Sequence, residues 1–267
     1  NLTDWETNTI HANNFKFYEE LDEVIQREPS DLFSPELLGM ASAIGIQKGK
    51  PFNPSPEQKA LLTEAVAIGN ATARSILFGP QDPKNYIYPD KAGFWQTGFP
   101  GGSHEYLVDN GNGGRDMDGR TLFFYLATVN TPAMALEIPG VGSQYAFTSR
   151  DGTGAYLDGS NTYKLNIPAN PPAQKFWSFV VYDPQTRSML QSGEMPYPSK
   201  NNKRNADMVK NADGSIDLYF GPAAPAGMEA NWVKTVPGKG WFGIFRLYGP
   251  GQEWFDRTWK LGDIEKI

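Results

Sequence analysis

Apolar residues recur every three or four positions through the first part of the chain, which is the spacing of one face of an α-helix. The pattern predicts helices over residues 11–27, 34–45 and 55–79. Ser34 and Ser55 each precede a Pro-Glu pair, so we expect them to be N-caps with proline in the first helical turn. Residues 1–80 are therefore expected to form a helical lead-in.

The next segment, residues 81–142, is rich in glycine, proline and aromatic residues and is expected to be mostly loop. One further helix is predicted over about 116–129, where the apolar residues again keep helical spacing. Asp116 and Asp118 lie at its expected N-terminal end, where the helix dipole favours negative charge.

From about residue 143 the pattern changes to short segments that are rich in aromatic and β-branched residues and separated by turn signals such as Asp-Gly and Pro-Gly. The predicted strands are 145–149, 162–167, 176–183, 215–220, 231–236 and 241–248. Many short strands in series predict an antiparallel β-sandwich or jelly roll over residues 143–267. The expected fold class is therefore α+β, with the helical lead-in packed on this sandwich.

Composition narrows the classes of function. The chain has 267 residues, of which 39% are apolar and 20% charged, as in a folded protein. A net charge of −6 argues against nucleic acid or an anionic membrane as the main partner. The absence of cysteine excludes disulfides and thiolate chemistry. No apolar run is long enough for a membrane-spanning helix, and no nucleotide-binding motif occurs, so we expect no cofactor.

One arginine stands out in the strand pattern. Arg246 shares a strand face with Phe242, Ile244 and Tyr248 by the two-residue period, so its charge lies among apolar neighbours. Such an arginine needs a counter-charge or an open cleft. Asp217 is the expected counter-charge.

Two interpretations of this arginine remain open. Arg246 and Asp217 form a structural ion pair, or they line a cleft where the guanidinium binds a carboxylate, a phosphate or sugar hydroxyls. Tyr182 is expected either to add a hydroxyl to that cleft or to lie at the edge of the core.

Other residues give weaker signals. Trp95 lies in a Gly/Pro-rich loop, where its ring either anchors the loop on the core or is exposed for stacking on a sugar. A hydrolase would need paired carboxylates, for which Asp183, Glu194 and Asp217 are candidates. His104 follows a serine, but no G-x-S-x-G motif accompanies them.

No metal site is expected. The acidic loop at residues 109–118 lacks the regular ligand spacing of an EF-hand, although an irregular calcium site there stays open.

Several motifs in series resemble one known family. They are LDGSNTY at 157–163, FWS at 176–178, VYD at 181–183, NADGSIDLY at 211–219, EANW at 229–232, FRLY at 245–248, WK at 259–260 and DIE at 263–265. Their order resembles the domain of unknown function 1214, which usually follows a domain of unknown function 1254. The resemblance extends over roughly residues 140–267.

The resemblance implies a bacterial protein with a jelly-roll or sandwich fold, often directed to the cell envelope, and it implies no general activity. A periplasmic or secreted location is therefore expected, with the cytoplasm also open. The helical lead-in resembles the connecting stretch of such two-domain proteins. We expect most or all of the preceding 1254-like domain to be missing from this chain, so that such a domain or fragment is a candidate partner. Association into a homo-oligomer is left open.

The combined expectation is a module of the bacterial envelope or exterior that binds a glycan or a small anionic ligand, or that serves in assembly. The alternative is a hydrolase that acts on a glycan or ester and needs the absent partner domain. A structural half that mainly receives this partner is a third interpretation. The ligand-binding candidates are the residues named above, Arg246, Asp217, Tyr182, Trp95 and Asp183.

Overall fold

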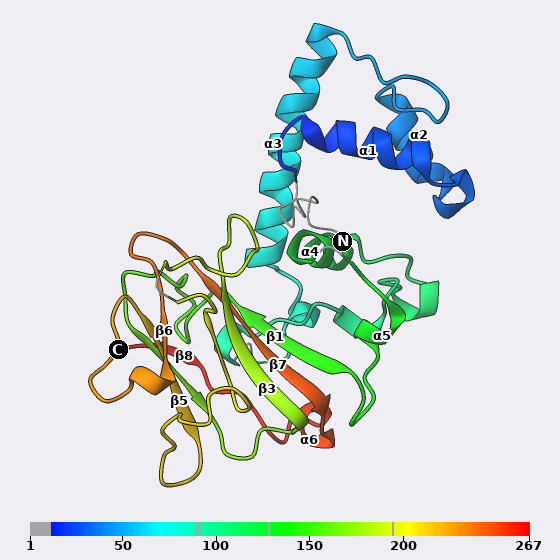
Figure 1. Ribbon diagram of the computed structural model, residues 1–267. Helices are drawn as coiled ribbons and strands as arrows, with labels where there is room; N and C mark the ends of the chain where they lie inside the picture. Colours follow the sequence, from blue (N-terminus) through cyan, green and yellow to red (C-terminus); the bar gives the residue numbers. More distant parts are fainter. Residues whose placement is uncertain (1–11, 89, 91, 128, 194) are drawn as a thin grey trace, which may run out of the picture. The chain divides into compact units, whose positions relative to one another are not determined.

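The computed structural model describes residues 12–267 except 89, 91, 128 and 194 (Figure 1). The chain divides into two compact units, Asn1–Ser75 and Ile76–Ile267. The loop-rich residues 81–142 therefore belong to the same unit as the strands that follow them. The predicted α+β fold class is confirmed, and the described residues form no closed barrel.

The N-terminal unit is helical. Its helices are α1 (Lys16–Arg27), α2 (Pro35–Ala43) and α3 (Pro56–Phe78), the last of which continues into the second unit. Ser34 caps α2, because its hydroxyl accepts a hydrogen bond of 3.4 Å from the Leu37 amide. The predicted helices are thus confirmed, although α1 begins at Lys16; residue 11, where the predicted helix began, lies outside the described part.

The C-terminal unit contains two four-stranded sheets, with strand orders β1-β7-β3-β4 and β6-β5-β2-β8. The strands of the first sheet are β1 (Ser143–Thr148), β3 (Ala173–Tyr182), β4 (Ser199–Asn201) and β7 (Phe242–Pro250). Those of the second sheet are β2 (Tyr163–Ile167), β5 (Ile216–Gly221), β6 (Trp232–Lys234) and β8 (Ile264–Lys266). All neighbours pair antiparallel except β5 and β6.

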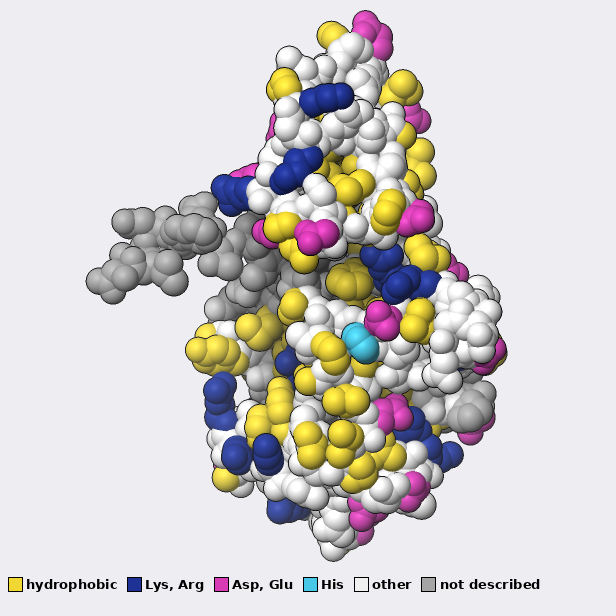
Figure 2. All heavy atoms as spheres, turned by 90° about the vertical axis from the view of Figure 1, so that its right-hand side faces the viewer, with side chains coloured by type: hydrophobic (Ala, Val, Ile, Leu, Met, Phe, Trp, Pro, Cys, Tyr) yellow, Lys and Arg dark blue, Asp and Glu magenta, His cyan; other side chains and the backbone are white. Residues whose placement is uncertain are grey.

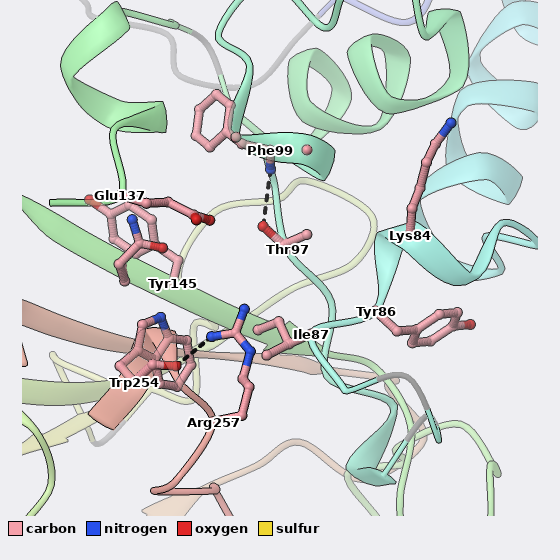
Figure 3. A pocket seen from close by; sticks show the side chains of 12 residues that line it. Lys84, Tyr86, Ile87, Thr97, Phe99, Glu137, Tyr145, Trp254 and Arg257 are labelled. Carbon is pink, nitrogen blue, oxygen red and sulfur yellow. Dashed lines mark hydrogen bonds between the residues drawn. The ribbon is translucent and has the colours of Figure 1, made fainter. Parts of the chain in front are cut away.

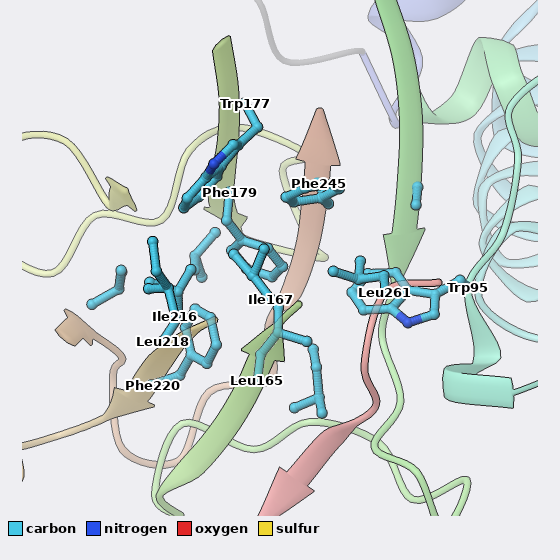
Figure 4. Close-up of a cluster of buried hydrophobic side chains, with 14 of the residues drawn as sticks. Trp95, Leu165, Ile167, Trp177, Phe179, Ile216, Leu218, Phe220, Phe245 and Leu261 are labelled. Atoms are coloured by element: carbon cyan, nitrogen blue, oxygen red, sulfur yellow. The ribbon is translucent and has the colours of Figure 1, made fainter. Parts of the chain in front are cut away.

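The main core fills the space between the two sheets, as Figure 4 shows. Phe179 of β3 and Phe220 of β5 meet there with their ring centroids 4.8 Å apart. Trp95 enters the same core from the loop-rich segment and is fully buried. The loop before the strands is therefore anchored by an aromatic side chain between the sheets.

The outer face of the first sheet is also covered. Phe147, Phe242 and Ile244 point away from the main core and pack with Leu122 of α4 (Met117–Leu126) and with the end of α3. A neighbouring cluster joins α4 to α5 (Pro132–Ala135) and to Phe99. This cover converts an otherwise exposed sheet face into the wall of a pocket.

The predicted helix at 116–129 is observed as α4, which starts where expected. The Asp116 carboxylate accepts a hydrogen bond of 2.9 Å from the Gly119 amide and caps the helix. The helix ends at Leu126, earlier than predicted. A last short helix, α6 (Gln252–Phe255), follows β7, and single 3₁₀ turns lie at Ser30–Leu32, Pro83–Asn85, Ala92–Phe94, Pro100–Gly102, Asp109–Gly111 and Glu229–Asn231.

Candidate functional site

Arg246 lies near the middle of β7, on the covered outer face of the first sheet. The alternation along β7 sends Phe245 and Leu247 into the main core and leaves Arg246 on the opposite face. Its neighbours across the sheet are Tyr145 of β1 and Ser178 of β3. The sequence prediction of an arginine on an apolar strand face is confirmed.

Aromatic hydroxyls and rings surround the guanidinium. Its Nη2 donates a hydrogen bond to the hydroxyl of Tyr182. The guanidinium carbon lies 5.5 Å from the ring centroid of Tyr145 and 5.8 Å from that of Tyr182, within the range of cation–π attraction. The Nε of Arg246 is buried and has no hydrogen-bond partner among the described residues. The cation is thus held by the hydroxyl of Tyr182 and by two aromatic rings, and its buried Nε is left without a partner among the described residues.

A pocket of about 260 Å³ opens beside this arginine. Apart from two arginines and backbone, its walls are aromatic and aliphatic; they include Phe99, Phe123, Leu126, Met134, Tyr145, Phe147, Tyr182, Phe242 and Ile244. No carboxylate and no imidazole occurs among the described lining residues. The pocket therefore combines an apolar body with positive charge.

Arg187 is the second arginine in the wall, and the sequence analysis did not identify it. Its Nε and Nη1 each donate a hydrogen bond of 3.2 Å to Tyr125, to the carbonyl oxygen and the hydroxyl respectively. The guanidinium carbon also lies 4.1 Å from the centroid of the Tyr125 ring. Arg187 adopts a left-handed backbone conformation with φ of 57° in the turn after β3. A single arginine in a turn has no periodic signature in sequence.

Charge states in the pocket are set by burial and by contact. Burial raises the pKa of the Tyr182 hydroxyl, against the opposing effect of the Arg246 charge. Burial by itself would lower the pKa of Arg246, but the nearby hydroxyls of Tyr182 and Tyr248 outweigh it, and the pKa is raised. At neutral pH the guanidinium is therefore charged while the phenol keeps its proton.

The expected pairing of Arg246 with Asp217 is wrong. Asp217 lies on β5, in the second sheet, where Ile216 and Leu218 on either side of it point into the main core. Its carboxylate points outward and accepts a hydrogen bond of 2.7 Å from the Asn166 side chain. Arg246 and Asp217 both point away from the core, but from different sheets, so the core separates them.

Trp95 anchors the core and is not exposed. Its side chain is fully buried, and its Nε1 donates a hydrogen bond of 3.0 Å to the Gly262 carbonyl oxygen. The expectation of an exposed ring for sugar stacking is therefore wrong, and the alternative of core anchoring is confirmed.

Asp183 is buried in the turn after β3, where its carboxylate forms an ion pair with Lys239 and accepts a hydrogen bond of 2.7 Å from the Gln185 amide. These contacts give Asp183 a structural role in the turn, outside the pocket of Arg246. Its assignment as a ligand-binding or hydrolytic residue stays a prediction.

The other hydrolytic and metal candidates lie apart from this pocket. His104 is exposed in a loop (Figure 2). Glu194 lies outside the described residues. In the part of the chain that the structure describes, no three His, Asp or Glu side chains converge where they could hold a metal ion, the loop at 109–118 included.

Residues 142–252 match the model of a known protein family. This stretch matches the family described as protein of unknown function, DUF1214. The predicted resemblance is thus supported for this stretch, and the 1254-like partner domain is not shown. The matched stretch supplies the sheet residues of the pocket, Tyr145, Tyr182 and Arg246, whereas α4 and α5 precede it.

Among the solved structures that are similar to the chain are two of low sequence identity to it. The VPA0106 protein from Vibrio parahaemolyticus is 18% identical with a TM-score of 0.45, over 94% of this chain and 55% of that one. An uncharacterised protein from Burkholderia cenocepacia is 15% identical with a TM-score of 0.35, over 47% of this chain and 29% of that one. The chain thus spans about half the length of the Vibrio protein. No curated protein matches the sequence.

No helix among the described residues has both the length and the hydrophobicity required to cross a lipid bilayer.

Proposed function

We propose that the C-terminal unit binds a small amphipathic anion, a medium-chain or aromatic monocarboxylate, in the pocket beside Arg246. The observation that carries this proposal is the buried Nε of Arg246, which has no partner among the described residues. A buried donor without a partner costs about 1–3 kcal/mol. A ligand carboxylate that accepts from Nε would offset this cost.

The chemistry of the guanidinium favours a carboxylate. Its planar donors match the two oxygens of a carboxylate, and the charge makes such hydrogen bonds stronger than neutral ones. Nη2 already donates to Tyr182, so this tyrosine fixes the plane of the guanidinium. The ligand would therefore meet an arginine that is already oriented.

The walls favour an apolar body on that carboxylate. Phe123, Met134, Phe147 and Ile244 give an apolar surface on which an alkyl chain or a single aromatic ring gains free energy by leaving water. A glycan would bury many hydroxyls against these walls without partners, which is costly. The pocket therefore supports the anionic ligand better than the glycan of the sequence-based expectation.

The alternative of hydrolysis receives no support from this pocket, because its described lining offers neither a carboxylate nor an imidazole to serve as a general base.

Arg246→Met is expected to weaken the binding of octanoate roughly 10- to 100-fold, because a charge-assisted hydrogen bond contributes about 1.5–3 kcal/mol. Isothermal titration calorimetry of octanoate with the full chain measures this. Arg204→Met is the matched control: Arg204 also lies over a tyrosine ring, at 5.0 Å from Tyr197, but it is exposed and outside the pocket. Equal octanoate affinities of the Arg246→Met variant and the wild type would refute the proposal.

Two further comparisons test the role of the charge, and thermal unfolding checks that the variants fold. Octanol has the same alkyl chain without the carboxylate. We expect the wild type and the Arg246→Met variant to bind octanol with similar affinity. Arg246→Lys keeps the positive charge and should retain part of the octanoate affinity. Cooperative thermal unfolding of each variant shows that a lost affinity does not come from a lost fold.

The affinity for octanoate is expected to stay constant between about pH 6 and 9. The pKa of Arg246 and the pKa of Tyr182 are both raised from values that already lie at or above the upper end of this range, so neither group changes its charge there. Calorimetric titrations at several pH values measure this. A steep loss of affinity within the range would mean that another titrating group controls binding.

A further inference from the structure

A second pocket adjoins the first and has a different character. It has a volume of about 320 Å³ and shares Phe99 and Tyr145 with the pocket of Arg246 (Figure 3). Its other lining residues include Arg257, which follows α6, and Glu137, which follows α5. Arg257 and Glu137 therefore bring opposite charges to one small pocket.

Arg257 is held in place by its backbone and by Trp254. It adopts a left-handed conformation with φ of 60°, which is uncommon for a residue with a side chain. Its Nη1 donates a hydrogen bond to the carbonyl oxygen of Trp254, and its guanidinium carbon lies 5.6 Å from the centroid of that ring. Among the described residues no carboxylate forms an ion pair with it. The charge is positioned but not neutralised.

Glu137 faces the same space from the other side. Its carboxyl carbon lies beside the backbone of Gly102, at 3.9 Å from the place where a Cβ would be. Within the described ranges the carboxylate has no ion-pair partner. In Figure 3 the carboxylate of Glu137 and the guanidinium of Arg257 both turn toward the open space between them.

The remaining polar groups of this pocket are already engaged. Lys84 forms ion pairs with Asp82 at 2.9 Å and with Asp116 at 3.2 Å, and Figure 3 shows its side chain pointing away from the other two charges. Thr97 accepts a hydrogen bond of 3.2 Å from the Phe99 amide. Arg257 and Glu137 are therefore the charged groups that are left to meet a ligand.

We propose that this second pocket binds a small zwitterion of the α-amino acid type. The ligand carboxylate would accept from Arg257, and the ligand ammonium would donate to Glu137. The rings of Trp254 and Tyr145 line the pocket and would contact a small apolar side chain. This inference is independent of the proposed function, because its charged groups do not line the pocket of Arg246.

Isothermal titration calorimetry of the full chain with glycine, L-leucine and L-phenylalanine tests this inference. At least one of the three is expected to bind at millimolar concentration or below. For the best of them, Arg257→Met and Glu137→Gln should each weaken binding tenfold or more, whereas Arg204→Met should leave it unchanged. The corresponding amino acid amide, which lacks the carboxylate, should bind at least tenfold more weakly to the wild type.

Several outcomes would overturn the inference: no binding of any of the three amino acids, equal binding of the amide, or unchanged affinity in both pocket variants. Competition between octanoate and the amino acid distinguishes this second site from the proposed carboxylate site. Octanoate is expected to leave the affinity for the amino acid within about twofold of its original value. Displacement of the amino acid by octanoate would place both molecules in one pocket and refute a separate zwitterion site. Cooperative unfolding of Arg257→Met and Glu137→Gln provides the check on folding.

Discussion

Phe179→Ala is expected to lower the free energy of unfolding of the C-terminal unit by about 3–5 kcal/mol. Phe179 is fully buried between the sheets. Its ring meets Phe220 of the opposite sheet at 4.8 Å between centroids and Trp95 edge-on at 6.5 Å. Because two segments distant in sequence, β5 and the loop of Trp95, pack on this ring, they cannot both move to fill the cavity that its removal leaves.

Urea denaturation followed by tryptophan fluorescence measures this loss. Phe176→Ala is the matched control, since Phe176 lies on the same strand but is only partly buried and stacks on Tyr248. We expect the control to lose less than half as much stability as Phe179→Ala. Equal losses in the two variants would contradict a core built between the two sheets.

Asn231→Ala is expected to cost about 2–4 kcal/mol of the free energy of unfolding. Asn231 is almost completely buried, and its side chain forms hydrogen bonds with backbone groups of two separate segments. Its Oδ1 accepts from the Val209 amide at 2.7 Å, while its Nδ2 donates to the carbonyl oxygens of Val209 at 2.9 Å and Asp217 at 2.8 Å. Alanine would leave these groups without partners, each at about 1–3 kcal/mol where water does not replace the bond.

Chemical denaturation of Asn231→Ala beside Asn161→Ala tests this role. Asn161 is partly buried, and its side chain donates a single long hydrogen bond, of 3.4 Å, to the Tyr163 hydroxyl. Its replacement is expected to cost less than about 1 kcal/mol, within the range of ordinary substitutions away from the core. If Asn231→Ala were no more destabilising than Asn161→Ala, the buried amide would not be a significant cross-link.

The elements of the fold were largely predictable because most of them are long enough for their hydrophobic periodicity to be recognised. All the predicted strands are present, with ends shifted by a few residues. The strands that the sequence did not predict, β4 and β8, have three residues each, too few for a clear two-residue alternation. β6 is equally short, but it was predicted from the longer segment at 231–236, which is rich in aromatic and β-branched residues. The missed helices α5 and α6 have four residues each, about one helical turn.

The candidate site was predictable only in part. Strand alternation correctly placed Arg246 on an apolar face and Asp217 on the face opposite to Ile216 and Leu218. Alternation cannot reveal which sheet a strand joins, so it could not show that the core separates Arg246 from Asp217. The contact between Arg246 and Tyr182 comes from the pairing of β3 with β7, which brings distant segments together.

The sequence predicted the helix α4, but nothing in it indicated that α4, α5 and the loop of Phe99 lie over the outer sheet face. Phe99, Phe123 and Met134 come from the loop-rich segment and from α4 and α5, and only tertiary packing brings them onto the outer sheet face. Trp95 illustrates the same limit, because an aromatic residue in a loop is compatible with both a buried anchor and an exposed platform. The envelope or extracellular location likewise stays a prediction from the family resemblance.

A crystal of the full chain soaked with 4-bromobenzoate would show whether a carboxylate binds beside Arg246, because anomalous scattering from bromine locates the ligand without ambiguity. We expect one bromine among Phe123, Met134 and Ile244, with the ligand carboxylate within hydrogen-bond distance of the Arg246 Nε. Soaked crystals of Arg246→Met should show no bromine in this pocket. Two results would contradict the proposed carboxylate site. One is an empty pocket of Arg246 in wild-type crystals at saturating 4-bromobenzoate, and the other is a ligand carboxylate that points away from Arg246.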